Sequence, residues 1–137
     1  MNAKLLIVVA LCLLSATACQ DSPSQPTVPL NQQFTLAPGE AATVTGASLQ
    51  VRFVRVTGDS RCPGDAICIQ GGDAIVQISV GNRNGSADYE LHTGDSSRSA
   101  VSHAGFRVEL VSLEPYPFSS RPFSPDQYRA ILKVSGS

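Results

Sequence analysis

Apolar and polar residues alternate with a period of two through most of the chain that follows Asn31. A period of two places successive side chains on opposite faces of a β-strand. The pattern predicts strands over residues 34–36, 41–45, 49–56, 74–80, 87–91, 106–110 and 128–134. The 3.6-residue period of an amphipathic helix is absent from this part of the sequence. We therefore predict an all-β domain over residues 31–137, an antiparallel β-sandwich of about seven or eight short strands with an immunoglobulin-like or barrel-like outline.

Two places in this pattern predict more than a plain strand. Val54 and Val56 fall on the opposite phase from Val51 and Phe53, which predicts a β-bulge near Phe53 or a strand buried on both faces. Residues 84–85 are an Asn-Gly pair between two apolar runs, and this pair favours a tight hairpin turn.

The first eighteen residues follow a different pattern. Lys4 precedes an apolar run over residues 5–14, and the small residues 15–18 separate that run from Cys19. This is the pattern of a secretory signal peptide that is cleaved ahead of Cys19. A transmembrane helix needs about 20 apolar residues, so we expect this shorter segment to be removed as a signal and not to remain as a span.

The residues before Cys19 resemble the lipobox of bacterial lipoproteins. In that family the cysteine receives a diacylglyceryl group and becomes the first residue of the mature protein, which implies lipidation of Cys19. Ala16 stands where the lipobox usually has leucine, and Ala16-Thr17-Ala18 also fits ordinary signal-peptidase cleavage. By resemblance to lipoprotein sorting signals, Gln20 implies the outer membrane in a bacterium that has two membranes.

The number of cysteines favours lipidation over ordinary cleavage. Cys12 leaves with the signal, and lipidation of Cys19 leaves Cys62 and Cys68 to form one disulfide in an oxidising compartment. Ordinary cleavage would leave three cysteines and an unpaired thiol at the new terminus.

Three prolines and few apolar residues mark the segment 20–29 as a tether. Extended, it would span about 30 Å. The predicted organisation is a signal peptide over 1–18, a lipidated cysteine with a flexible linker over 19–30, and one domain over 31–137.

The charge of the mature chain is nearly balanced. Loss of residues 1–18 removes Lys4, and the remaining 119 residues carry nine basic and eleven acidic side chains, a formal charge of −2. A surface of this kind lacks the basic footprint of a nucleic-acid-binding protein, so we expect no nucleic-acid partner.

The centre of the chain resembles a family of small uncharacterised bacterial lipoproteins and secreted proteins. The resemblance rests on Asp-Ser-Arg-Cys-Pro at 59–63, on Cys68 four residues later, and on a Gly-Asp-Ala stretch that leads into a strand. Leu-Glu-Pro-Tyr-Pro at 113–117 and the Tyr-x-Ala-x-Leu-x-Val strand at 128–134 extend it. The resemblance implies one intact module but no particular activity.

Three carboxylates, Asp59, Asp65 and Asp73, lie near the predicted disulfide. Oxygen ligands of this kind suit Ca²⁺, although they lack the regular spacing of a calcium loop. The alternative, which we favour, is that each aspartate caps a turn through the local backbone or pairs with Arg61.

A second irregular segment, residues 114–125, contains four prolines. Tyr116, Phe118, Arg121 and Phe123 are residue types that are enriched at binding hot spots, so this is a candidate binding loop. Equally, the aromatics could close one end of the sandwich. Arg-Pro-Phe at 121–123 resembles a loop of chagasin-like protease inhibitors, whose Asn-Pro-Thr-Thr-Gly motif is absent here.

Catalytic motifs are scarce. A triad of Ser96, His103 and Asp95 can be drawn, but no Gly-x-Ser-x-Gly elbow supports it, and we expect His92 and His103 to face solvent. A zinc site that combines these histidines with the two cysteines has the wrong spacing and would need reduced thiols.

The sequence therefore predicts a lipid-anchored protein of the bacterial envelope that acts as a non-catalytic binding or structural module. Its expected partners are the membrane, through the anchor, and another envelope protein, and no cofactor is expected. The alternatives are a small hydrolase that uses His92 or His103, and a protease-inhibitor-like β-sandwich. The hydrolase alternative requires a carboxylate and a hydroxyl near a histidine, whereas inhibition requires the loops at 62–68 and 115–125 to converge.

Overall fold

The computed structural model describes residues 24–137, so the predicted signal peptide and Cys19 lie outside the described residues. Within this range the strands are β1 (Thr27–Pro29), β2 (Gln33–Leu36), β3 (Ala41–Thr45), β4 (Leu49–Asp59), β5 (Ala74–Asn82), β6 (Gly85–His92), β7 (Ala100–His103), β8 (Phe106–Glu114) and β9 (Arg129–Gly136). Two short 3-10 helices, η1 (Ser96–Arg98) and η2 (Pro125–Gln127), complete the elements.

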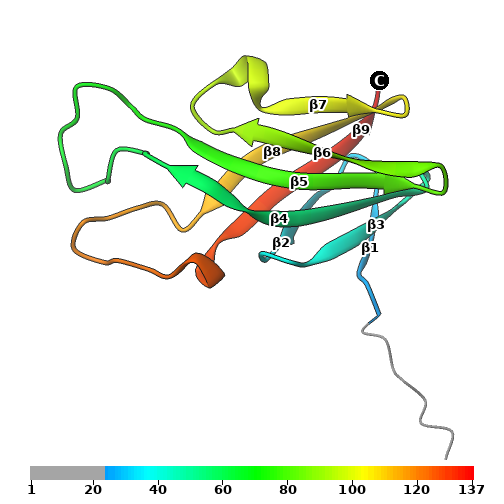
Figure 1. Cartoon of the computed structure of the whole chain (residues 1–137), viewed down its shortest axis with the longest axis horizontal. Helices are drawn as coiled ribbons and strands as arrows, with labels where there is room; N and C mark the ends of the chain where they lie inside the picture. Colours follow the sequence, from blue (N-terminus) through cyan, green and yellow to red (C-terminus); the bar gives the residue numbers. More distant parts are fainter. Residues whose placement is uncertain (1–23) are drawn as a thin grey trace, which may run out of the picture.

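The strands form two sheets that pack face to face (Figure 1). One has the order β1-β3-β4-β5-β6 and the other the order β2-β9-β8-β7. Every neighbouring pair is antiparallel except β1 with β3, which is parallel. The predicted all-β sandwich is confirmed.

The core lies between the sheets and follows the predicted alternation. In β5 the inward residues Ala74, Val76, Ile78 and Val80 are fully buried, whereas the residues between them are partly exposed. Phe53 of β4 is the largest fully buried side chain. Burial of a side chain of this size stabilises the folded state by roughly 1.5–3 kcal/mol. The face of each strand that carries the apolar residues is therefore the face that packs inward.

The predicted linker over residues 19–30 is wrong at its C-terminal end, because β1 lies within it. The N–H of Thr43 donates to the carbonyl of Pro26, and Thr27–Pro29 then pairs with β3. Prolines argued against a strand because they lack an N–H donor, but at the edge of a sheet that loss costs no ladder bond. The described domain therefore includes Pro26 and β1, and does not begin at Asn31.

The strand count also exceeds the prediction, since nine strands form where seven or eight were expected. Besides β1, the additional strand is β7, a short edge strand that pairs with the first half of β8. Its four residues alternate too briefly to predict a strand from sequence.

The predicted irregularities of β4 and the β5–β6 hairpin are present. The β4–β5 ladder shifts register after Phe53 and again after Val56, so the bulge is confirmed. At the hairpin, Asn82 pairs with Gly85 across the turn. Among the described residues, no helix is long and apolar enough to cross a membrane.

Candidate functional site

Three long connections meet at one end of the sandwich, on the left in Figure 1. They are residues 60–73 between β4 and β5, residues 93–99 between β6 and β7, and residues 115–128 between β8 and β9. The N–H of Gly64 donates to the carbonyl of Pro117 at 2.9 Å, which joins the first connection to the third. We call residues 60–73 and 115–128 together the loop platform. The two loops therefore converge at one end of the sandwich, as a single binding edge requires.

A disulfide closes the tip of the platform. Cys62 and Cys68 are bonded, with Cα atoms 5.9 Å apart, so the predicted pairing is confirmed. Ile67 and Ile69, on either side of Cys68, are fully exposed, with relative exposures of 104% and 105%. The N–H of Cys62 also donates to the carbonyl of Gly71 at 3.0 Å, which closes the base of this loop. The tip therefore presents two isoleucines to solvent from a covalently closed loop.

Arg61 links the two halves of the platform. Its guanidinium donates to both carboxylate oxygens of Asp59 at 2.9 and 2.7 Å, to the carbonyl of Leu113 at 2.7 Å and to that of Pro115 at 3.1 Å. The side chains of Arg61 and Asp59 are 7% and 14% exposed. Partial burial acts to raise the pKa of Asp59, but hydrogen bonds from Arg61 and Tyr128 outweigh it and hold the pKa below its usual value. This ion pair is shielded from water, and it orients the loop that carries Cys62.

Asp65 forms a second link. Its carboxylate accepts the backbone N–H groups of Ser119 at 2.8 Å and Ser120 at 3.0 Å, and these two bonds lower the pKa of Asp65 to about 2. Next to it, a Cβ on Gly64 would lie 2.8 Å from the ring of Phe118, so the absence of a side chain there lets the ring pack against the backbone. Both contacts fasten the disulfide loop to the proline-rich loop.

The four predicted binding-loop residues divide between internal packing and exposure. Phe118 lies under Arg121, with the guanidinium carbon 4.9 Å from the ring centroid. Phe123 packs edge-on against Tyr128 with ring centroids 5.1 Å apart. Tyr116 is 48% exposed and donates its hydroxyl to the carbonyl of Cys62 at 2.9 Å. Phe118 and Phe123 thus help to hold the loops in place, and Tyr116 presents a face to solvent.

His92 lies at the boundary between β6 and the platform. The expectation that it faces solvent is wrong, because it is 5% exposed and its Nδ1 lies 2.5 Å from Oδ2 of Asp73, to which it donates. Partial burial acts to raise the pKa of Asp73, but the bonds from His92 and from the N–H of Gly94 outweigh it and lower the pKa. Asp73 therefore ties the base of the 60–73 loop to the end of β6.

The three aspartates considered for Ca²⁺ do not converge. Asp59 binds Arg61, Asp65 binds the backbone at 119–120, and Asp73 binds His92. Within residues 24–137 no group of three or more His, Cys, Asp or Glu side chains is arranged to hold a metal ion. The structure thus gives each carboxylate a partner in the protein, but the favoured interpretation named the right kind of partner only for Asp59. Asp65 and Asp73 bind groups that are distant in sequence, and neither caps its own turn or pairs with Arg61.

The triad drawn from the sequence is not assembled. Asp95 caps η1 through the N–H of Ser97 and binds Arg98, while Nδ1 of His103 is hydrogen-bonded to the hydroxyl of Tyr89 at 2.8 Å. No serine or threonine hydroxyl is hydrogen-bonded to His92 in the described part of the chain. His92 thus has a carboxylate partner, Asp73, and His103 has a hydroxyl partner, Tyr89. Cys62 and Cys68 are bonded to each other, so the zinc site that the spacing already disfavoured has no thiolate ligands.

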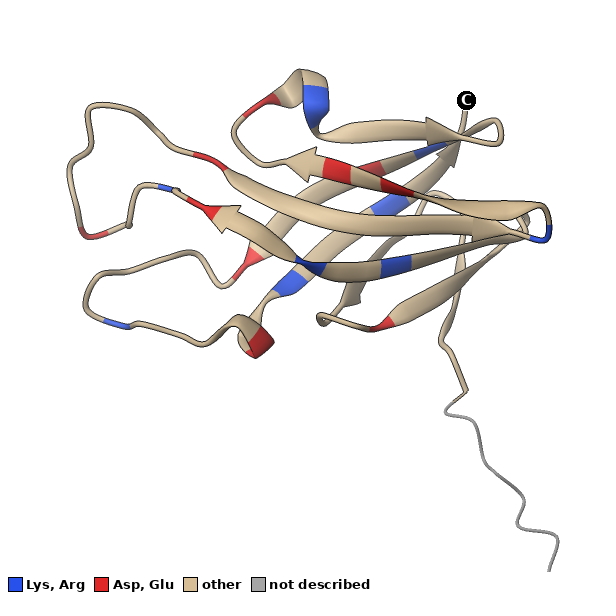
Figure 2. Ribbon diagram, in the orientation of Figure 1, with Lys and Arg blue, Asp and Glu red and all other residues tan. Residues whose placement is uncertain are grey.

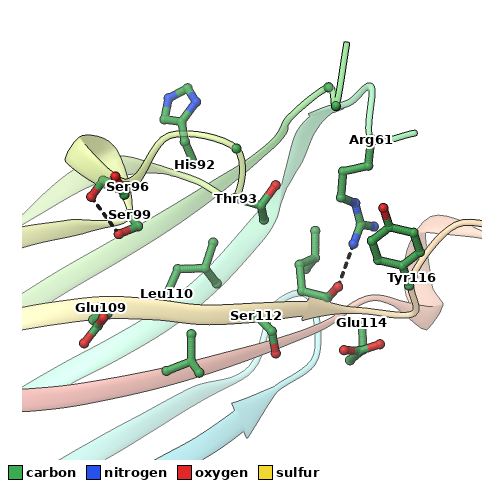
Figure 3. Close-up of a pocket in the computed structure, with 15 residues that line it drawn as sticks. Arg61, His92, Thr93, Ser96, Ser99, Glu109, Leu110, Ser112, Glu114 and Tyr116 are labelled. Carbon is green, nitrogen blue, oxygen red and sulfur yellow. Dashed lines mark hydrogen bonds between the residues drawn. The ribbon is translucent and has the colours of Figure 1, made fainter. Parts of the chain in front are cut away.

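A groove of about 790 Å³ runs beside β8 (Figure 3). Arg61 and Tyr116 lie at one end of it and Ser96 and Ser99 at the other. One wall is β8, from Glu109 to Glu114, and the other includes His92, Thr93 and the glycines at 71, 72 and 94. The groove therefore joins the loop platform to the edge of the sandwich.

Charged residues of both signs are interspersed over strands and loops (Figure 2).

The chain matches no known family model, no curated protein and no solved structure. Its function is therefore inferred from the residues of the site.

The prediction from sequence missed two features of this site, and one of them left a signal. Ile67 and Ile69 are large apolar residues inside a segment rich in Gly, Asp and Pro, where no alternation assigns them to the core. The contact between Asp73 and His92 left none, because their pairing depends on how β5 and β6 are aligned.

Proposed function

We propose that this protein is a lipid-anchored protein of the bacterial envelope, placed in the outer membrane where one exists, and that its β-sandwich is a non-catalytic module that binds another envelope protein. The loop platform is the binding surface. The observation that carries the proposal is the pair of fully exposed isoleucines, Ile67 and Ile69, on a loop that the protein fastens at several points.

Exposure of the two isoleucines that flank Cys68 adds nothing to the stability of the isolated fold. Burial of each would gain roughly 1.5–3 kcal/mol, which a partner can provide. The platform needs little reordering on binding, because the disulfide, Arg61 and Asp65 already hold its loops. A binding surface ordered in advance loses less conformational entropy when a partner docks.

The position of the platform suits an anchored protein. In Figure 1 the platform lies at one end of the long axis, and the described chain starts from the other half of the molecule. A tether at the N-terminus would therefore leave the platform free to face away from the membrane.

Crosslinking in the native envelope tests the proposal. The full-length protein is compared with the double variant Ile67→Ser/Ile69→Ser, and Arg83→Ser in the hairpin at the opposite end serves as the control. We expect one partner to be captured by the unaltered protein and by the control, and its capture to fall at least about tenfold in the double variant. Loss of 1.4 kcal/mol of contact free energy is enough for that change. Equal capture by all three proteins would refute the platform as the binding surface.

Protease inhibition is a narrower form of the same proposal, and the convergence of the 60–73 and 115–128 loops at one edge supports it. Titration of a papain-like cysteine protease with the protein tests it. An inhibitor abolishes activity at a one-to-one ratio, and full protease activity at a large molar excess of the protein would exclude this form.

A further inference from the structure

The groove beside β8 exposes a strand edge that no other described strand pairs with. β7 pairs with β8 over Phe106–Glu109, and the carbonyl of Ser99 accepts the N–H of Leu110 at 2.8 Å. Beyond that point, the side of β8 opposite β9 has no strand partner among residues 24–137. The open edge from Val111 to Glu114 forms the wall of the 790 Å³ groove.

The backbone of Leu113 shows which way this edge points. Its carbonyl accepts a hydrogen bond from Nη1 of Arg61, which lies at the end of the groove. The N–H and the C=O of a strand residue point to the same side of the strand. The N–H of Leu113, a residue that is 3% exposed, therefore also points toward the groove, where an added strand can accept it. A bulge between Leu110 and Ser112 sets this orientation for the last part of β8.

The opposite wall leaves room for a backbone. Gly71, Gly72 and Gly94 line it, and at Gly71 the backbone faces open space, with no atom within 4 Å of where a Cβ would lie. Hydroxyl groups of Thr93, Ser96, Ser99 and Ser112 are distributed along the groove (Figure 3). Small residues and hydroxyls suit a peptide whose main chain supplies most of the hydrogen bonds.

The charged residues of the groove indicate which side-chain charge a bound peptide would need. The positive charge of Arg61 is matched by Asp59, and His92 is bonded to Asp73. Oε2 of Glu109 lies 3.8 Å from Nζ of Lys133. Glu114, in contrast, takes part in no ion pair or side-chain hydrogen bond within residues 24–137. The free charge at the open end of β8 is therefore negative, and it complements a basic side chain.

We propose that the groove binds an extended segment of another protein as an added strand along β8, with a lysine or arginine of that segment facing Glu114. This inference rests on the proposed binding function and names the form of the partner. The exposed isoleucines contact the body of that partner, while the groove takes its extended segment.

Synthetic hexapeptides provide the probe. The first is acetyl-Thr-Val-Lys-Val-Thr-Val-amide, the second has glutamate in place of lysine, and the third is the lysine peptide with N-methyl groups on alternate residues, which removes its strand-pairing donors. Binding to the full-length protein in detergent is followed by isothermal titration calorimetry. Amide hydrogen exchange locates the bound peptide.

We expect the lysine peptide to bind at least fivefold more tightly than the glutamate peptide, to protect the amide of Leu113 and to lose its binding when N-methylated. Glu114→Gln should abolish the preference for lysine. Glu90→Gln, at an exposed glutamate of β6 outside the groove, should leave that preference unchanged.

Equal binding of the N-methylated peptide, or no binding of any peptide at millimolar concentration, would overturn the added strand. If the peptides fail while Ile67→Ser/Ile69→Ser still abolishes crosslinking, strand addition is wrong and the platform proposal stands. If both experiments fail, neither proposal holds.

Discussion

Replacement of Arg61 by methionine should destabilise the domain by about 3 kcal/mol, because it leaves the shielded carboxylate of Asp59 without its cationic partner. Methionine keeps most of the apolar stem but loses two bonds to Asp59 and the bonds to the carbonyls of Leu113 and Pro115. Removal of one partner from a buried ion pair costs about 3–5 kcal/mol. The lower figure applies because Tyr128 still donates to Asp59, at 2.8 Å, after the change.

The assay is urea denaturation followed by far-UV circular dichroism at pH 7. Arg98→Met is the matched control, because Arg98 also binds an aspartate but the side chains of that pair are 60% and 38% exposed. Exposed pairs of this kind contribute roughly 0–1 kcal/mol, so the control should unfold near the midpoint of the unaltered protein.

A double-mutant cycle with Asp59→Asn separates the ion pair from the loss of packing. The double variant should be more stable than the sum of the two single effects predicts, by at least about 1 kcal/mol, because the two side chains are in direct contact. Additive effects, or a cost of Arg61→Met no greater than that of Arg98→Met, would show that Arg61 does not hold the platform together.

Three further predictions concern the disulfide, the acid stability and the anchor. Cys62→Ser/Cys68→Ser should lower the free energy of unfolding by about 2.4 kcal/mol, the chain-entropy value for the closed loop from Cys62 to Cys68, whose ends have a sequence separation of 6 and which therefore counts both cysteines and the residues between them. A thermal melting curve that coincides with that of the unaltered protein would contradict it. The folded pKa of Asp65 is about 2, below its ordinary value of 3.8, so its stabilising bonds are complete above pH 3.8 and are lost as the pH falls toward 2. In Asp65→Asn the free energy of unfolding should fall less steeply between pH 4 and pH 2 than in the unaltered protein. An equally steep fall in both proteins would count against the contact. Finally, intact-mass analysis should find acyl chains on Cys19 that are absent from Cys19→Ala, whereas an unmodified mature terminus would refute the anchor.

The sequence predicted the strands that contribute most to the core. The alternation in β5 maps directly onto buried and exposed faces, because neighbouring residues of a strand point in opposite directions. β1 and β7 escaped prediction because each is a short edge strand whose place is decided by a neighbour and not by its own apolar residues.

The candidate site was predicted in its parts but not as an assembly. The cysteine pair was predicted correctly, because its two residues lie close together in sequence. Pairing with Arg61 was one of two options considered for the three aspartates, and the structure shows it for Asp59. The interpretation of His92 as solvent-facing was wrong, because the carboxylate that it binds belongs to a different strand connection.

The sequence by itself therefore determined the fold class, the inner faces of the main strands and the disulfide. Each of these depends on periodicity or on spacing within one segment. Only the tertiary structure decided that the 60–73 and 115–128 loops form one platform and that β8 has an open edge. The side-chain contacts that join the loops connect residues 54 to 55 positions apart, and such pairings arise only when the two sheets pack and align the ends of their strands.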